Sequence, residues 1–136
     1  MADVAVKLSW TGEGLIFRGG REGGPEAVVD GNGKAGPSPM QALLLAAAGC
    51  SGADVVDILA RMRVPLTGLE VLVEGERVSE HPRRFTTIRL RYLARGVPAE
   101  AEERLRRAVQ LSHEKYCSVL HTLRPDVVVE SDVALQ

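Results

Sequence analysis

The clearest helix start in the chain lies in the stretch Ser38-Pro-Met-Gln-Ala-Leu-Leu-Leu-Ala-Ala-Ala-Gly-Cys-Ser-Gly52, around which the rest of the architecture is arranged. Ser38 is a favoured N-cap residue, and the proline that follows it suits the first helical position. Gln41 stands at the position where its side chain can form a capping box with the serine. We expect the helix to run to about Arg63, because Pro65 cannot continue it.

This predicted helix is apolar on every side over residues 42–48, rather than on a single stripe. A helix that lies on one sheet buries one face and exposes the other. A chain of 136 residues with only one other substantial helix is too short to cover both sides. We therefore predict that a second copy of the chain completes the core, in a homodimer. The alternative is that an alanine-rich run is weakly hydrophobic and tolerates partial exposure.

Hydrophobic patterns on either side of this helix predict a fold of the α+β class. Alternation and turn residues predict strands at residues 4–9, 15–18, 26–30, 69–78, 86–93 and 126–133. A second helix is expected over 98–116 and a short one over 117–123. The inner stripe of the second helix is Ala101, Leu105, Ala108, Val109 and Ser112. The order shows no alternation of strand, helix and strand, so we expect antiparallel sheets in a single domain, 1–136.

Composition and charge exclude several classes of protein. Hydrophobic residues make up 45% and charged residues 26%, which are globular values. A formal net charge of −1 and an aromatic content of 4% disfavour nucleic acid and acidic lipid as partners. The first residues lack the pattern of a signal peptide, and no run reaches the ~18 apolar residues of a membrane span. We expect a cytoplasmic protein with no nucleic-acid or membrane partner.

Cys50 lies midway along the apolar helix, between Gly49 and Gly52. A free cysteine in such a place is commonly a small buried hydrophobic residue. Each glycine, however, costs ~1 kcal/mol of helix propensity relative to alanine, and the pair would leave both flanks of the sulfur open. Asp54, one turn later, disfavours a thiolate. A reactive Cys50 therefore needs a cation from elsewhere in the fold.

Arginines of the N-terminal part are candidates for that cation. The stretch Gly19-Gly-Arg-Glu-Gly-Gly24 is no phosphate loop, because it lacks the lysine and the following helix. It predicts a flexible turn that can hold Arg21, or the nearby Arg18, beside a pocket. The simplest interpretation of Arg83, Arg84, Arg89, Arg91 and Arg95 is a solvated sheet face interleaved with glutamates.

Cys117 stands where the short helix is expected to begin. A thiol at a helix N-terminus is favoured as a thiolate by the helix dipole and the free N–H groups. The alternative is another buried cysteine. The distance of Cys117 from Cys50 along the chain does not say whether the two sulfurs meet.

A metal site is not expected from the two cysteines and three histidines. They form no C-x-x-C or H-x-x-x-H pair. Cys117 and His121 could form a nucleophile–base pair or half a metal site, but a histidine in that place is more often an exposed helix residue.

Two blocks of sequence carry a family resemblance, Pro37-Ser-Pro-Met-Gln-Ala-Leu-Leu-Leu-Ala-Ala-Ala-Gly-Cys-Ser51 and Glu114-Lys-Tyr-Cys-Ser-Val119. With a strand pair and a helix between them, the chain resembles the OsmC/Ohr family (osmotically inducible protein C and organic hydroperoxide resistance proteins), and within it the small OsmC-like branch. The resemblance covers nearly the whole chain. It implies an intertwined homodimer whose sheets wrap long central helices, with active sites at the interface.

The resemblance also implies a thiol peroxidase in oxidative stress defence, acting on organic hydroperoxides. Cys50 matches the family's peroxidatic cysteine. Cys117 matches the resolving cysteine, which condenses with the Cys50 sulfenate to a disulfide. A dithiol or lipoyl-type reductant then acts from outside, and no bound cofactor is implied. Arg21 resembles the arginine that stabilises the thiolate, and the apolar substrate pocket would be lined by Leu43, Leu44, Ala47 and Val119.

The chain departs from the family pattern in the first turn of the central helix. Active peroxidases of the family carry there an acidic residue that holds the arginine, whereas this chain has Met40 and Gln41. Gln41 could hydrogen-bond an arginine but cannot neutralise it. Two functions stay open. The cysteines favour a peroxidase, and the missing carboxylate favours a small dimeric ligand-binding or redox-sensing protein.

Overall fold

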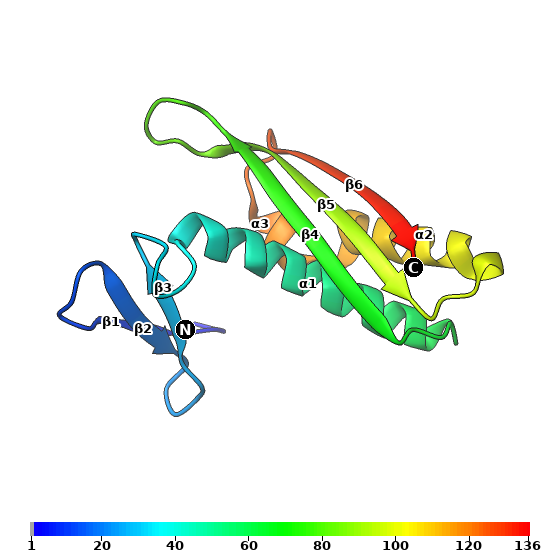
Figure 1. Cartoon of the computed structure of the whole chain (residues 1–136), viewed down its shortest axis with the longest axis horizontal. Helices are drawn as coiled ribbons and strands as arrows, with labels where there is room; N and C mark the ends of the chain where they lie inside the picture. Colours follow the sequence, from blue (N-terminus) through cyan, green and yellow to red (C-terminus); the bar gives the residue numbers. More distant parts are fainter. Residues whose placement is uncertain (1) are drawn as a thin grey trace. The chain divides into compact units, whose positions relative to one another are not determined.

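The computed structural model describes residues 2–136 and confirms the α+β class (Figure 1). Its elements are β1 (Lys7–Trp10), β2 (Ile16–Gly20), β3 (Ala27–Asp30), α1 (Pro39–Arg61), β4 (Gly68–Arg77), β5 (Phe85–Arg95), a 3₁₀ turn (Ala99–Ala101), α2 (Glu102–Leu111), a π turn (Ser112–Tyr116), α3 (Ser118–Thr122) and β6 (Val128–Leu135). They form two compact units, one up to Leu43 and the other Leu44–Gln136. A single domain over 1–136 stays a prediction.

The first unit contains an antiparallel sheet of β1, β2 and β3, with β2 in the centre. The loop after β3 is organised by the buried carboxylate of Asp30. This carboxylate accepts hydrogen bonds from the backbone N–H groups of Ala35 (3.0 Å), Asn32 (2.9 Å) and Lys34 (3.2 Å). These bonds, that of Ala35 foremost, hold the pKa of Asp30 below its usual value. The loop leads the chain into α1.

Helix α1 begins as the sequence predicts. The N–H of Gln41 donates to Oγ of Ser38 at 3.2 Å, and the N–H of Ser38 donates to Oε1 of Gln41 at 2.9 Å. The two residues therefore form a reciprocal capping box. The helix ends at Arg61, slightly before the predicted end, and the backbone of Arg63 then turns left-handed with a φ of 59°.

Replacing Ser38 with alanine is expected to lower the free energy of unfolding by about 1 kcal/mol. The substitution removes the side-chain acceptor of the Gln41 N–H at the start of α1. Chemical denaturation measures the difference. Ser79→Ala, in the exposed loop between β4 and β5, is the matched control and should change stability little. Equal losses in the two variants would contradict the assignment of the cap.

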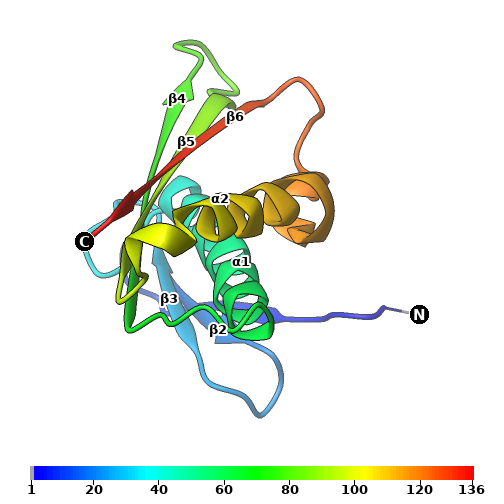
Figure 2. The ribbon, with the colours of Figure 1, turned by 90° about the vertical axis from the view of Figure 1, so that its right-hand side faces the viewer.

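The second unit is built on the sheet of β4, β5 and β6, with α1 and α2 on the same face of that sheet (Figures 1 and 2). Strands β4 and β5 pair antiparallel, as expected. Strand β6 pairs parallel to β5, which corrects the expectation of purely antiparallel sheets. Parallel neighbours need a crossover connection, and the helical segment that contains α2 and α3 supplies it. The expectation of no strand–helix–strand unit is therefore wrong.

The core of the second unit lies between this sheet face and the two helices. The inward side chains of β5, which are Ile88, Leu90 and Tyr92, are at most 1% exposed, as their alternation with arginines predicts. Val55 and Leu59 of α1 are also fully buried. The predicted inner stripe of the second helix, Ala101, Leu105, Ala108, Val109 and Ser112, is buried throughout.

The opposite face of the sheet is charged. Arg89 pairs with Glu76 at 3.1 Å and with Glu130 at 3.2 Å, and Arg95 pairs with Glu70 at 3.1 Å. The interpretation of the strand arginines as a solvated face is therefore confirmed for β5. Arg83 and Arg84 precede the strand rather than lie on it.

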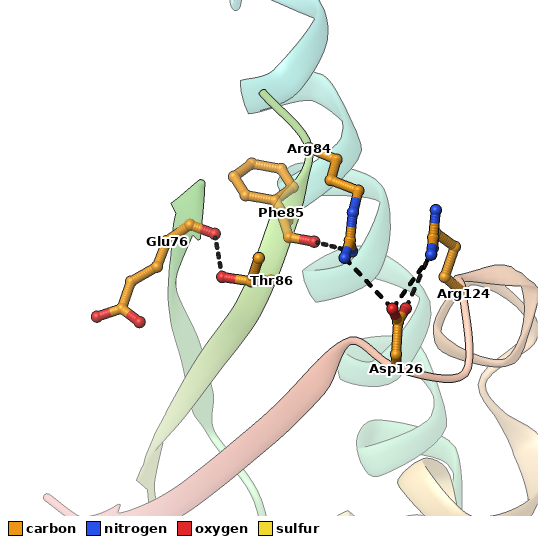
Figure 3. A network of polar contacts seen from close by, with 6 residues as sticks. All are labelled: Glu76, Arg84, Phe85, Thr86, Arg124 and Asp126. Carbon is orange, nitrogen blue, oxygen red and sulfur yellow. Dashed lines mark hydrogen bonds and ion pairs between the residues drawn. The ribbon is translucent and has the colours of Figure 1, made fainter. Parts of the chain in front are cut away.

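A small polar network holds the end of the crossover beside the start of β5 (Figure 3). Asp126 accepts hydrogen bonds from Arg124 at 3.1 and 3.2 Å and from Arg84 at 3.3 Å. Arg124, and then Arg84, keep the pKa of Asp126 below its usual value. The network places the chain for the parallel entry of β6.

One side of α1 stays uncovered within a single chain. Five exposed residues recur at helical spacing along it, Leu45, Gly49, Ala53, Val56 and Ala60. We call this set the open face of α1. Leu45 is 57% exposed and Val56 is 48% exposed, which is unusual for large apolar side chains placed on one stripe.

Helix α1 also bears on the question of a membrane span. By length and composition alone it could cross a membrane, with a mean hydropathy of 1.7 over its most apolar window. This corrects the expectation that no segment is apolar enough. The finding is weak evidence for a span, because the core helix of a soluble protein passes the same test.

Candidate functional site

Cys50 and Cys117 meet inside the second unit. Their Sγ atoms and a carboxylate oxygen of Asp54 all lie within 4.8 Å of one another. Cys50 and Asp54 stand one turn apart on α1, whereas Cys117 joins the π turn to α3. Both cysteines are free thiols. The packing of α1 beside the C-terminal helices thus answers the question that the sequence leaves open.

Cys50 is the more accessible of the two thiols, because it is half-buried while Cys117 is fully buried. A Cβ atom built on Gly49 would meet nothing within 4 Å, so this side of the cysteine is open. Gly52 is buried, and a Cβ there would touch Val71 at 3.6 Å, an ordinary contact distance. The expectation that both glycines clear the sulfur therefore holds for Gly49 alone.

Cys117 is held by local backbone geometry. Its N–H donates to the carbonyl oxygen of Ser112 at 2.8 Å and closes the π turn. Its Sγ accepts a hydrogen bond of 3.4 Å from the N–H of Leu120, so the side chain caps α3 as predicted.

The structure distinguishes between the two alternatives for Cys117, a thiolate at a helix start and a buried thiol. Burial raises the pKa of the Cys117 thiol to about 11, and its hydrogen bond to Cys50 and the charge of Asp54 act in the same direction. The bond from Leu120 opposes this shift but is outweighed. Of the two alternatives that the sequence leaves open for Cys117, the buried thiol is therefore supported, because the single hydrogen bond from Leu120 does not compensate for the loss of hydrating water. At neutral pH Cys117 is a thiol that can donate a hydrogen bond to Cys50.

A chain of buried polar side chains leads away from the cysteines. Ser112 donates to Oδ2 of Asp54 at 2.9 Å, and its Oγ lies 2.8 Å from Oγ of Ser51. Ser51 in turn lies 2.5 Å from the hydroxyl of Tyr92, which is 2.7 Å from Nε2 of His113. Ser51, Ser112 and Tyr92 are completely buried. Every one of them finds a partner, as buried polar groups require.

The sequence contains a signal for this hydrogen-bonded series of side chains. Tyr92 takes an inward position of β5, and Ser112 belongs to the inner stripe of the second helix. A buried tyrosine hydroxyl and a buried serine each need hydrogen-bond partners, and in the structure both find one in Ser51. Burial raises the pKa of Tyr92 to about 12 and lowers the pKa of His113. Both side chains are therefore neutral at neutral pH.

The free energy of unfolding is expected to fall as the pH drops below about 6.5, the ordinary pKa of histidine. Burial lowers the pKa of His113, so the unfolded chain binds more protons than the folded chain in this range, and stability decreases with decreasing pH. The slope for one proton is at most about 1.4 kcal/mol per pH unit, and partial solvation of the ring makes it smaller. Urea denaturation between pH 7 and 5 measures it. His113→Gln should flatten the slope and His121→Gln should keep it. An unchanged slope in His113→Gln would contradict the prediction.

Comparison with known proteins assigns the sequence to a family. Residues 31–132 match the family model described as OsmC-like protein, and both cysteines lie inside this range. The chain belongs to the OsmC-like family. It is 44% identical to Protein YhfA of Escherichia coli (strain K12) over 117 residues, which is 85% of this chain and 86% of that protein.

Solved structures agree with this OsmC-like fold. A hypothetical protein from Aquifex aeolicus VF5 is 31% identical, with a TM-score of 0.81 over 100% of this chain and 99% of that one. The organic hydroperoxide resistance protein OhrB of Bacillus subtilis is 16% identical, with a TM-score of 0.64 over 98% of this chain and 100% of that one. At this identity the likeness to OhrB shows the fold alone.

The OsmC-like chain carries Arg21 in the first compact unit, just after β2, where it is exposed. The N–H of Gly24 bonds to its carbonyl oxygen at 3.0 Å, which confirms the predicted turn. Because the cysteines lie in the second unit, the role of Arg21 at the Cys50 sulfur stays a prediction. Helix α1 has no acidic residue in its first turn, and Oε1 of Gln41 is occupied by the capping box.

The cysteine–aspartate cluster also has the spacing of metal donors. Within residues 2–136 the cluster offers three donor atoms, whereas a structural zinc site takes four protein ligands. We do not assign these residues as metal ligands, and the absence of a metal stays a prediction. His121 does not belong to this group of donor atoms, and its Nε2 lies 3.0 Å from the carbonyl oxygen of His113.

Proposed function

We propose that the chain is a thiol-dependent peroxidase that reduces organic hydroperoxides and protects the cytoplasm from them. The observation that carries the proposal is the meeting of an accessible thiol, Cys50, with a fully buried one, Cys117, within 4.8 Å. A disulfide needs two sulfurs at about 2 Å, so a modest movement of the side chains joins them.

In the first step the Cys50 thiolate attacks the terminal oxygen of the hydroperoxide. A sulfur–oxygen bond forms, the oxygen–oxygen bond breaks, and the leaving alkoxide takes up a proton to become an alcohol. Cys50 is oxidised to a sulfenic acid. Cys50 is the attacking sulfur because it is the half-buried thiol, while Cys117 is enclosed and held as a thiol.

In the second step the Cys117 sulfur displaces the hydroxyl group of the sulfenic acid. The disulfide forms, and the thiol proton of Cys117 leaves with the hydroxyl as water. A dithiol or lipoyl-type reductant then exchanges with the disulfide, is itself oxidised to a disulfide, and restores both thiols. The protein needs no bound cofactor for this cycle.

The active form in this proposal is a homodimer. The partner would cover the open face of α1, beside which Cys50 lies, and would complete an apolar pocket for the organic part of the substrate. The pocket residues we propose are Leu43, Leu44, Ala47 and Val119, and Arg21 is proposed to stabilise the thiolate. Nucleic acid and membrane are not partners in this proposal.

The family supports the redox assignment. OhrB of Bacillus subtilis is described as an organic hydroperoxide resistance protein, and the chain shares its fold. A second candidate function is a redox-sensing or small-ligand-binding protein. It is favoured by the lack of an acidic residue in the first turn of α1, because nothing there would hold an arginine over Cys50.

Steady-state peroxide consumption tests the proposal. Reduced protein is mixed with cumene hydroperoxide or hydrogen peroxide, with dihydrolipoamide as the electron donor. We expect catalytic consumption of both, with cumene hydroperoxide preferred at least about tenfold, because an apolar pocket adds roughly 1.4 kcal/mol for a few buried carbon atoms. Oxidation of the protein in a single turnover without catalysis would favour the redox sensor. If the reduced protein reacts with neither peroxide, both redox functions are contradicted.

A further inference from the structure

The hydrogen bonds that link Asp54 to His113 all donate in one direction, toward Asp54. This follows from counting the hydrogens that each side chain can donate. Ser112 has a single hydroxyl hydrogen and donates it to the Asp54 carboxylate. It must therefore accept from Ser51 across their 2.8 Å contact. Ser51 has then used its own hydrogen and must accept from the hydroxyl of Tyr92, 2.5 Å away.

The same count fixes the tautomer of His113. Tyr92 donates its only hydroxyl hydrogen to Ser51, so its oxygen can only accept across the 2.7 Å contact with Nε2 of His113. Since the lowered pKa keeps this histidine neutral at neutral pH, its one ring proton must sit on Nε2 and leave Nδ1 as an acceptor. The charge of Asp54 thus orders every hydrogen as far as His113.

His113 is the end of the chain nearest to solvent. It is only partly buried, and it lines a surface cavity of about 260 Å³ between the C-terminal part of α2 and β6. The other end of the chain, Asp54, lies within 4.8 Å of both sulfurs. The three links between these ends are excluded from water, so a proton that travels between them must pass along the hydroxyls.

We propose that the chain Asp54–Ser112–Ser51–Tyr92–His113 is a proton route that carries protons inward, from the surface at His113 to the cysteine pair. The inference rests on the proposed peroxidase function for its use, although the order of the hydrogens does not. Asp54 is the acid–base group beside the sulfurs, and the other four are positioning residues.

The route supplies the proton that the leaving alkoxide needs. When the Cys50 thiolate breaks the oxygen–oxygen bond, Asp54 receives a proton from Ser112 and passes it to the alkoxide. Ser51, Tyr92 and Nε2 of His113 each hand on one hydrogen, and Nδ1 of His113 takes up a proton from water. The balance is thiolate, hydroperoxide and one proton on one side, and sulfenic acid and alcohol on the other.

Other charged groups face His113 and enter any pH profile. Arg106 and Glu114 line the cavity from the helical segment, and Asp132 lines it from β6. His121 contacts the His113 carbonyl from α3. A test should leave these surface residues unchanged. Substitutions at the buried residues between Asp54 and His113 are therefore preferable.

Nitrogen NMR of the histidine rings tests the order of the hydrogens without any peroxide. In the reduced protein at pH 7.5 we expect the ring proton of His113 on Nε2. Tyr92→Phe removes the acceptor, and Asp54→Asn removes the charge that orders the chain, so both should give a mixture of tautomers. Tyr116→Phe and Asp57→Asn, which change exposed residues, are the matched controls and should keep the Nε2 form. A proton on Nδ1 in the unsubstituted protein would overturn the proposal.

Single-turnover oxidation tests the transport of protons. Stopped-flow loss of the Cys50 thiol with cumene hydroperoxide should slow about tenfold or more in Tyr92→Phe, a modest part of what acid–base catalysis supplies. The inflection that His113 contributes to the pH profile should disappear in Tyr92→Phe and in His113→Gln, and remain in Tyr116→Phe. A merely structural role would change the rate without removing the inflection, and that result would reject the route.

The two failures are distinguishable. If the unsubstituted protein does not consume peroxide, the proposed function fails. The NMR result still decides whether the hydrogens between Asp54 and His113 have the proposed order. If peroxide is consumed and Tyr92→Phe matches Tyr116→Phe in rate and profile, the route fails and the peroxidase stands.

Discussion

Replacement of Cys50 with serine is expected to reduce the catalytic consumption of organic hydroperoxide to below about a thousandth of the unsubstituted rate, as removal of a nucleophile does. A serine hydroxyl is not ionised at neutral pH and does not attack the oxygen–oxygen bond. The substitution is nearly isosteric at a half-buried position, so we expect the fold to persist. The assay follows peroxide with dihydrolipoamide as the reductant.

Cys117→Ser is the informative companion of this variant. It should keep the first step, so that each chain consumes about one hydroperoxide and then stops with an oxidised Cys50. Full catalytic activity in Cys50→Ser would refute the assignment of the nucleophile. Full activity in Cys117→Ser would leave Cys50 as the nucleophile and remove Cys117 from the cycle, with the external thiol as the resolving group.

Replacement of Ala53 with glutamate is expected to convert the proposed homodimer into monomers. Ala53 lies at the centre of the open face of α1, and in a single chain it is exposed. An unpaired carboxylate buried in an interface costs several kcal/mol. A cost of about 4 kcal/mol raises the dissociation constant roughly a thousandfold. Light scattering on the protein as it elutes from a size-exclusion column measures the change in mass.

Gln110→Glu is the matched control for this prediction, because it places the same charge on an exposed position of α2, away from the open face. It should leave the dimer intact. Ala53→Glu should keep the helical circular dichroism signal, since the added side chain meets solvent within one chain. A dimer of unchanged stability in Ala53→Glu would place the interface elsewhere and would leave the all-round apolar helix unexplained.

The parts of the fold that local chemistry determines were predictable. The capping box of Ser38 and Gln41 requires only residues close in sequence, and it forms as predicted. The alternation in β5 places Tyr92 on the inner face for the same reason. The direction of β6 was not predictable from alternation, because the period of a strand is the same in parallel and antiparallel pairs.

The candidate site was predictable only in part. The resemblance led to Cys50 and Cys117, and the structure brings their sulfurs together. The state of Cys117 depends on how completely it is buried, which a sequence pattern does not report. The partners of Ser51 lie 41 and 61 positions away along the chain, so no local motif contains them.

The product of one equivalent of cumene hydroperoxide with the reduced protein shows directly whether Cys50 and Cys117 react as a pair. Mass spectrometry of the digested protein identifies the oxidised sulfurs, and a thiol count measures how many remain. We predict one disulfide between Cys50 and Cys117 of the same chain, with both thiols lost. A sulfenic acid that persists on Cys50 while Cys117 stays a free thiol would show instead that the two sulfurs do not work as a pair.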